Sequence, residues 1–144
     1  MTKTPDLQRV VEQFQAGLDA FFRGDPGPCK LLMSRRDDVT LANPFGPIAL
    51  GWAQVEATMD HAGQNYRGGA ATGFEMVARY AALELAYTVW VERFKTRMGP
   101  DDALVAGALR RTTIYRLEPD GWRIAHTHAD PITTPRGAES LVKR

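Results

Sequence analysis

The sequence predicts an α+β domain in which three N-terminal helices pack on a strongly curved antiparallel sheet. Apolar residues in the first half recur at spacings of three and four, which is typical of amphipathic helices. The second half is rich in β-branched and aromatic residues, and short turns divide it, so its strands must pair antiparallel. Because a long twisted sheet curls, helices across its concave side leave a cone with an internal pocket.

The predicted helices occupy three segments before residue 67. The first spans residues 5–23, where Pro5 suits the first helical position and Gly24 can end the helix. Asp25-Pro26 then begins a short second helix that carries Cys29. A third helix spans residues 52–66, and Gly68-Gly69 stops it.

The predicted strands follow a single early strand at residues 37–43. Four further strands are expected at residues 72–80, 85–97, 104–117 and 122–130. Gly99-Pro100-Asp101-Asp102 and Glu118-Pro119-Asp120-Gly121 are clear turns, but the join at 81–84 has no turn residue, and a helix over 78–86 competes there. We therefore expect one domain over residues 1–132 and a frayed tail over 133–144.

Length and composition exclude several classes of protein. The chain has 144 residues, enough for one domain, and a net charge of +1, which argues against nucleic-acid and membrane-surface partners. The single cysteine, Cys29, cannot form an internal disulfide, and we interpret it as a buried, inert thiol. Without a secretory signal or a run of ~18 apolar residues, the expected location is cytoplasmic, away from membranes.

Several strings of the sequence resemble the SnoaL-like, ketosteroid-isomerase-like branch of the nuclear-transport-factor-like superfamily. The most specific is Gly-Trp-Arg-Ile-Ala-His-Thr-His-Ala-Asp-Pro at residues 121–131, and others lie at 37–41, 86–94 and 114–116. The resemblance covers residues 7–131. It implies a curved sheet around a long helix, a pocket at the open end and a homodimer formed through the sheet. Members of the superfamily include isomerases, polyketide cyclases, epoxide hydrolases, dehydratases and non-enzymatic modules, so the fold does not identify a reaction.

The sequence departs from two enzyme patterns of that superfamily. No position matches the base aspartate with a tyrosine and aspartic acid oxyanion hole of ketosteroid isomerases. The epoxide hydrolase pattern requires an arginine with two aspartates, but Thr112 stands two residues after Arg110, where an acid would be needed. The resemblance therefore assigns no specific reaction.

The last strand carries the candidate catalytic residues. Strict alternation places His126, His128 and Asp130 on the face that also holds Trp122 and Ile124. His128 is the predicted general acid or base and Asp130 its orienting partner, since an adjacent carboxylate raises the basicity of an imidazole. The alternative is a structural hydrogen-bond cluster or dimer seam, which we favour for His126. Two histidines and an acid could hold a divalent ion, but no further ligand is evident and we expect no metal.

A carboxylate in the middle of an apolar strand needs a partner. Glu92 is such a residue, and Arg110 or Arg111 in the next strand is the natural partner. We predict the Glu92–Arg110 pair, because Thr112 and Ile114 continue a plausible inner face beyond Arg110. The pair is either a structural ion pair or the polar floor of a ligand site.

Further ligand-binding residues are expected around the mouth of the pocket. Asn43 and Phe45 belong to a proline-rich segment that should rim it, and Trp90 is an aromatic neighbour of Glu92. Tyr66 lies on the buried stripe of the third helix and can direct its hydroxyl inward, although such a tyrosine is more often simply core. His61 falls outside that stripe and is expected to be solvated.

The leading hypothesis is a small-molecule-binding domain that takes an apolar, ring-containing ligand. Its enzymatic form would be a cofactor-independent isomerase, cyclase or hydratase that uses acid/base chemistry. No organic cofactor is expected, because the sequence has no glycine loop of the kind that binds phosphates. The alternative is a non-catalytic dimerisation or ligand-binding module with a shallow or filled pocket.

Overall fold

The computed structural model describes residues 4–142 and contains the predicted helices and sheet. The helices are α1 (Thr4–Phe21), α2 (Gly27–Lys30) and α3 (Trp52–Gly63), and a 3-10 helix, η1 (Ala138–Leu141), follows the sheet. The strands are β1 (Thr40–Ala42), β2 (Ala49–Leu50), β3 (Arg67–Ala81), β4 (Leu85–Arg97), β5 (Leu104–Glu118) and β6 (Gly121–Asp130).

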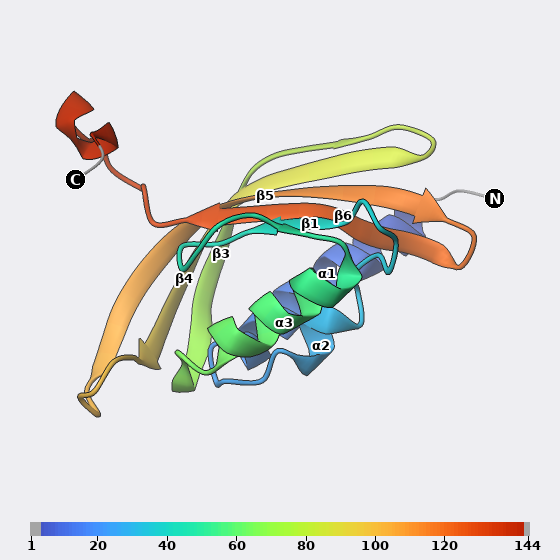
Figure 1. The fold of residues 1–144 in the computed structure, drawn as a ribbon. Coiled ribbons are helices and arrows are strands. Elements are labelled where there is room, and N and C mark those ends of the chain that lie inside the picture. Colours follow the sequence, from blue (N-terminus) through green and yellow to red (C-terminus); the bar gives the residue numbers. More distant parts are fainter. Residues whose placement is uncertain (1–3, 143–144) are drawn as a thin grey trace.

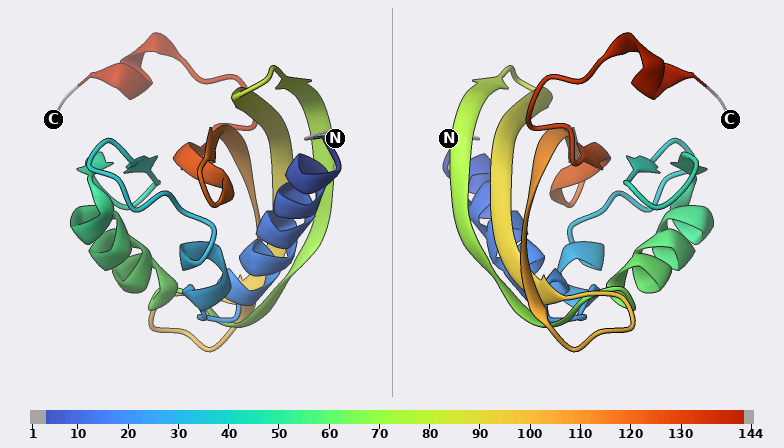
Figure 2. Two further views of the ribbon diagram at one scale, coloured as in Figure 1. Left: turned by 90° about the vertical axis from the view of Figure 1, so that its right-hand side faces the viewer. Right: turned by 90° about the vertical axis from the view of Figure 1, so that its left-hand side faces the viewer.

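All strands belong to one six-stranded sheet in the order β2-β1-β6-β5-β4-β3. Every neighbouring pair is antiparallel except β1 and β6, which run parallel. Figure 2 shows the sheet curling around the helices, which lie along its hollow side. The α+β cone that the sequence predicts is therefore confirmed, although its sheet is mostly rather than wholly antiparallel.

β-Bulges contribute to the curvature of the sheet. The pairing of β3 with β4 shifts register at three places along β3, and the pairing of β5 with β6 shifts once. Each extra residue bends its strand and increases the local twist. The shift in β6 also determines which residues face the interior, as described below.

The amphipathic stripe of α1 forms the centre of the core. Val11, Phe14 and Leu18 are buried, as three-four spacing predicts, and the Phe14 ring lies 5.8 Å from the Trp90 ring of β4. Just beyond α1, the ring of Phe22 stacks on Phe94 with 4.4 Å between centroids. Burial of each such side chain contributes about 1.5–3 kcal/mol, so this face fixes α1 across the sheet.

Some element boundaries differ from the prediction. The segment 64–66 forms turns rather than a last helical turn, because the N–H groups of Asn65 and Tyr66 bond to carbonyls only three residues earlier. Gly24 has a positive φ of 99°, and a side chain there would meet the Tyr66 carbonyl oxygen at 2.6 Å, so this close approach requires glycine.

The join between β3 and β4 is a hairpin turn, and the competing helix is wrong. The Ala82 N–H bonds to the Leu85 carbonyl at 2.8 Å, which closes the turn without glycine or proline. β1 is shorter than its predicted span of 37–43, and β2 was not predicted. A strand of two residues is too short to produce an alternating pattern.

The C-terminal segment follows β6 away from the sheet (Figure 1). Its described residues after Ile132 are exposed, whereas residues 143–144 of the expected tail lie outside the described part of the chain, as do residues 1–3. The domain limit at residue 132 stays a prediction. In residues 4–142, no helix is long and apolar enough to cross a membrane.

Candidate ligand-binding site

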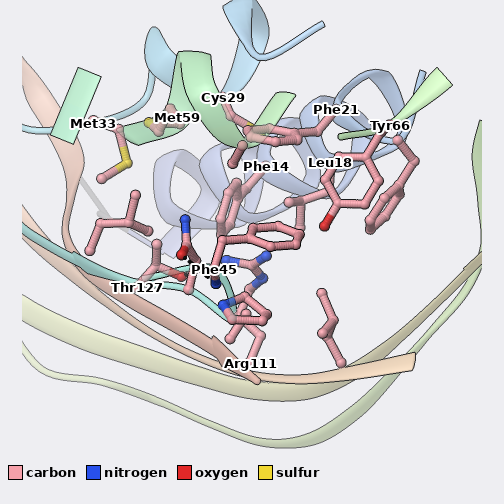
Figure 3. Close-up of a pocket in the computed structure, with 17 residues that line it drawn as sticks. Phe14, Leu18, Phe21, Cys29, Met33, Phe45, Met59, Tyr66, Arg111 and Thr127 are labelled. Atoms are coloured by element: carbon pink, nitrogen blue, oxygen red, sulfur yellow. Dashed lines mark hydrogen bonds between the residues drawn. The ribbon is translucent and has the colours of Figure 1, made fainter. Parts of the chain in front are cut away.

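A cavity of about 50 Å³ lies between the helices, the segment after β1 and the hollow face of the sheet (Figure 3). We call it the inner chamber. Most of its wall is apolar, and the polar side chains at the wall are those of Asn43, Tyr66, Arg111 and Thr127. The apolar lining residues are Phe14, Leu18, Phe21, Phe22, Cys29, Met33, Leu41, Pro44, Phe45, Met59, Ala62, Leu109 and Ala129.

Arg111 of β5 forms the polar floor of the inner chamber, and an ion pair joins it to Glu92 of β4. Nε of Arg111 donates to Oε1 of Glu92 at 2.7 Å, and Nη2 donates to Oε2 at 2.9 Å. Glu92 is fully buried, and Trp90 Nε1 also donates to its Oε1 at 2.8 Å. A buried carboxylate is tolerated because both of its oxygens accept strong hydrogen bonds.

The guanidinium of Arg111 faces the inner chamber and remains charged. Burial alone would lower its pKa, but Glu92 outweighs that effect and the pKa is raised. Nη1 donates to Thr127 Oγ1 at 3.0 Å (Figure 3). These bonds use one N–H of each nitrogen, and each terminal nitrogen carries a second N–H. The guanidinium can therefore supply further donors to an acceptor in the chamber.

The other ionisable groups at the wall are neutral at physiological pH. Burial raises the pKa of Tyr66 to about 12, and it raises the pKa of the Cys29 thiol to about 12. Cys29 therefore lacks the thiolate that a nucleophile needs, consistent with an inert thiol. The Tyr66 hydroxyl points into the chamber as a neutral hydrogen-bonding group (Figure 3).

The segment after β1 closes one side of the inner chamber. Asn43 Oδ1 accepts a hydrogen bond from the Phe45 N–H at 3.0 Å, an Asx turn that holds the segment in shape. The Phe45 ring makes an edge contact with Tyr66 at 6.0 Å between centroids. Asn43, Phe45 and Tyr66 thus lie where the sequence predicts ligand-binding residues, and their contact with a ligand stays a prediction.

The predicted Glu92–Arg110 pair is wrong, and Arg111 takes the place of Arg110. Glu92 is paired across the sheet with Leu109, so the inward residues of β5 are Leu109, Arg111, Thr113 and Tyr115. Arg110 lies on the outer face and pairs with Asp130, with 2.6 Å between Nε and Oδ1. The register between β4 and β5 determines whether Arg110 or Arg111 faces Glu92. The turn residues in the sequence do not specify that register.

The predicted inner face of β6 is also wrong beyond Ile124. Tyr115 pairs with Ile124 and Ile114 with His126, so Ala125 is the extra residue of a bulge. Before the bulge the buried side chains of β6 are at the even positions Trp122 and Ile124, and after it they are at the odd positions Thr127 and Ala129. His126, His128 and Asp130 consequently do not line the chamber.

His128 and Asp130 form a pair on the outer face. His128 Nε2 lies 3.2 Å from Asp130 Oδ2, and the His128 side chain is 50% exposed. His126 Nδ1 lies 2.8 Å from Thr40 Oγ1, which agrees with a structural hydrogen bond. Burial, together with the neighbouring His128, lowers the pKa of His126.

Two other expectations have a simple structural outcome. Trp90 and Glu92 do not line the inner chamber; they lie behind the Arg111 guanidinium, in the core. His61 is exposed on α3, as predicted. Among the described residues, no three His, Cys, Asp or Glu side chains gather in a group that could bind a metal.

Comparison with known proteins adds a family and a fold. A family model described as a SnoaL-like domain matches residues 10–133. No curated protein matches the chain. A nuclear transport factor 2 (NTF2-like) superfamily protein from Salmonella enterica serovar Typhimurium is similar in structure, with a TM-score of 0.74, 17% identity and 93% of each chain covered.

Two further solved structures carry names that suggest activities. A proposed dehydratase of the NTF2-like family from Streptomyces avermitilis has a TM-score of 0.73 and 20% identity, covering 92% of this chain and 98% of its own. A ketosteroid isomerase-like protein from Erwinia carotovora atroseptica has a TM-score of 0.71 and 15% identity, covering 88% and 94%. At these identities the likeness establishes the fold, and it does not transfer an activity.

Proposed function

The chain belongs to the family of SnoaL-like domains, and on that premise we propose that it binds a small molecule through a hydrogen-bond acceptor seated on Arg111. One observation carries the proposal. A guanidinium, held charged by buried Glu92, presents N–H groups to a cavity whose wall is otherwise mostly apolar. Binding sites for small molecules commonly combine apolar walls with a few well-placed polar groups.

The charge balance of the floor indicates the kind of acceptor. Arg111 and Glu92 together are neutral, so an anionic ligand would bring an uncompensated charge into a buried site. A neutral carbonyl oxygen can accept from the free N–H groups without that cost. We therefore propose a neutral carbonyl as the headgroup of the ligand.

The volume of the inner chamber limits what that headgroup carries. An apolar cavity of about 150 Å³ takes up benzene, whereas the inner chamber measures about 50 Å³. The chamber accommodates a carbonyl and its nearest carbons, and a ring requires more room than these side chains leave.

A binding role fits the chamber better than acid/base catalysis. Its described lining contains no His, Asp or Glu, and the pKa of both Tyr66 and Cys29 is about 12. General acid/base catalysis works best with a group whose pKa lies near the operating pH. The predicted pair for that task, His128 and Asp130, lies on the outer face.

The test is a titration with 2-butanone, a small neutral ketone, in which the chemical shifts of backbone amides report binding. Arg111→Lys removes the planar guanidinium and its N–H donors but keeps the positive charge. We expect it to lower the affinity for 2-butanone by at least about tenfold. Arg110→Lys is the matched control, because Arg110 is next to Arg111 in β5 but faces outward, and the affinity of this variant should equal that of the wild type. Equal affinities for all three proteins would contradict the proposal.

A second role, homodimerisation, is supported by an apolar area on the outer face of the sheet. Tyr80 and Tyr87 stack there at 5.9 Å, and with Leu85 and Ile114 they line a surface groove of about 300 Å³. Exposed apolar area of this kind favours protein contact. We propose that a second copy of the chain covers it.

Sedimentation velocity tests this second role. The wild type should sediment as a dimer, and Tyr87→Arg should sediment as a monomer because it places a charge in the interface. Leu141→Arg, in the segment beyond the sheet, is the control and should leave the dimer intact. A monomeric wild type at high micromolar concentration would rule the dimer out.

A further inference from the structure

A second cavity adjoins the inner chamber. It lies between α3 and the segment from Asn43 to Ala49, it measures about 400 Å³, and we call it the outer groove. The two segments lie side by side in Figure 2. Three residues line both cavities, namely Asn43, Phe45 and Ala62. The inner chamber and the outer groove therefore share a wall.

The outer groove uses a side of α3 that the core does not. Core contacts come from Val55 and Met59, and Ala62 is buried at the border of both cavities, whereas Gln54, Ala57, Thr58 and His61 line the groove alone. The latter set recurs at spacings of three and four, so it forms a separate stripe along the helix. At its middle, Ala57 has only a methyl group, which leaves room for a ligand.

The opposite wall of the groove is apolar and unusually exposed. Ile48 is 68% exposed and Phe45 is 43% exposed, and both line the groove. Next to Phe45, a Cβ atom added to Gly46 would meet nothing within 4 Å, so the surroundings of this segment are open. Large apolar side chains exposed beside a cavity are typical of a ligand-binding groove.

Phe45 contributes to the walls of both cavities. It contacts Tyr66 of the inner chamber by its edge, while the same residue lines the outer groove. The inner chamber of about 50 Å³ is too small for most ligands, but with the groove of about 400 Å³ the site reaches the usual range. That range is about 300–1,000 Å³ for sites of small molecules.

We propose that the outer groove is a second part of the ligand site, and that the ligand is elongated. Its carbonyl headgroup lies on Arg111, and its hydrocarbon body passes Phe45 and lies along Ala57 of α3. The polar residues Gln54, Thr58 and His61 border the far part of the ligand. This inference rests on the proposed function, because the headgroup position is taken from it.

A series of methyl ketones of increasing length tests the inference. Affinities of 2-butanone, 2-pentanone, 2-heptanone and 2-nonanone are measured by amide chemical shifts on the full chain. Because each methylene buried in the outer groove removes apolar area from water, affinity should rise with chain length, by up to about fourfold per methylene.

Filling the groove should abolish that increase. Ala57→Trp places an indole in the outer groove, so 2-nonanone should bind no better than 2-butanone, while 2-butanone itself should bind as to the wild type. Ala53→Trp is the matched control on an exposed position of α3 outside the groove, and it should preserve the full rise with length. Amide spectra confirm that both variants fold.

The outcomes separate the two proposals. If 2-butanone binds through Arg111 but longer ketones gain nothing, or if Ala57→Trp and Ala53→Trp behave alike, the outer groove is not part of the site. If no ketone binds the wild type, the proposed function fails and the elongated ligand fails with it.

Discussion

Arg110 and Arg111 are neighbours in β5, yet they belong to two different environments. Arg111 faces inward and binds fully buried Glu92 at 2.7 and 2.9 Å. Arg110 faces outward, binds Asp130 at 2.6 Å and has a side chain that is 54% exposed. The bond lengths are similar, so the difference between the two pairs lies in their access to water.

That difference predicts unequal consequences. Water screens the outer pair and replaces either partner when the other is removed, so such pairs contribute little. The inner pair is buried, so removing one partner leaves an unpaired charge in the core. The inner pair therefore stabilises the fold, and its Arg111 is also the floor of the proposed site.

The largest expected effect comes from breaking the inner pair. Glu92→Gln leaves the Arg111 charge without its counterion, and we expect a loss of about 3–5 kcal/mol in the free energy of unfolding. Arg111→Met should cost a similar amount, and the double variant should recover part of the loss because no charge remains buried. Urea unfolding measures all three, and losses that simply add would contradict the coupling.

A smaller effect is expected at Thr127, the residue that the bulge at Ala125 turns inward. Its hydroxyl accepts from Arg111 at 3.0 Å and lies 2.9 Å from the Thr113 hydroxyl. Thr127→Val should destabilise the protein by about 1–3 kcal/mol, because it leaves a buried donor without its acceptor. Thr127→Ser keeps the hydroxyl, so it should retain most of the stability in the same urea assay.

Titration of His126, on the outer face of β6, should appear in the pH dependence of the free energy of unfolding. The pKa of His126 is lowered in the folded protein by burial and by His128, so the unfolded chain binds protons more readily. The free energy of unfolding should therefore fall as the pH drops below about 6.5, the ordinary pKa of histidine. In His126→Asn this part of the pH dependence should disappear; an unchanged curve would exclude His126 as its source.

The smallest effect is expected for the outer ion pair. Arg110→Gln should leave the urea midpoint almost unchanged, and any shift should shrink further when salt is added, because salt screens exposed charges. Glu92→Gln serves as the reference for a large shift in the same series. A comparable shift for both variants would remove the distinction between the two faces.

The sequence predicts the positions of long strands better than it predicts which of their side chains point into the core. The strand at residues 85–97 has the predicted bounds, because its β-rich pattern runs without interruption up to the clear turn at residues 99–102. The bulge at Ala125 carries no glycine, proline or asparagine signal, so alternation along β6 placed His128 on the wrong side. Arg111 was one of two candidates, and only the pairing of Glu92 with Leu109, a long-range contact, selects it.

The central claim is that Arg111 is buried and in contact with the ligand, whereas Arg110 is exposed and makes no such contact. The most direct measurement follows the Nε–H signals of the two arginines by ¹⁵N NMR, first alone and then with 2-butanone. We predict slow hydrogen exchange for Arg111 and a signal that moves with the ketone, beside fast exchange and no response for Arg110. Equal exchange rates, or a ketone response at Arg110 alone, would contradict the account.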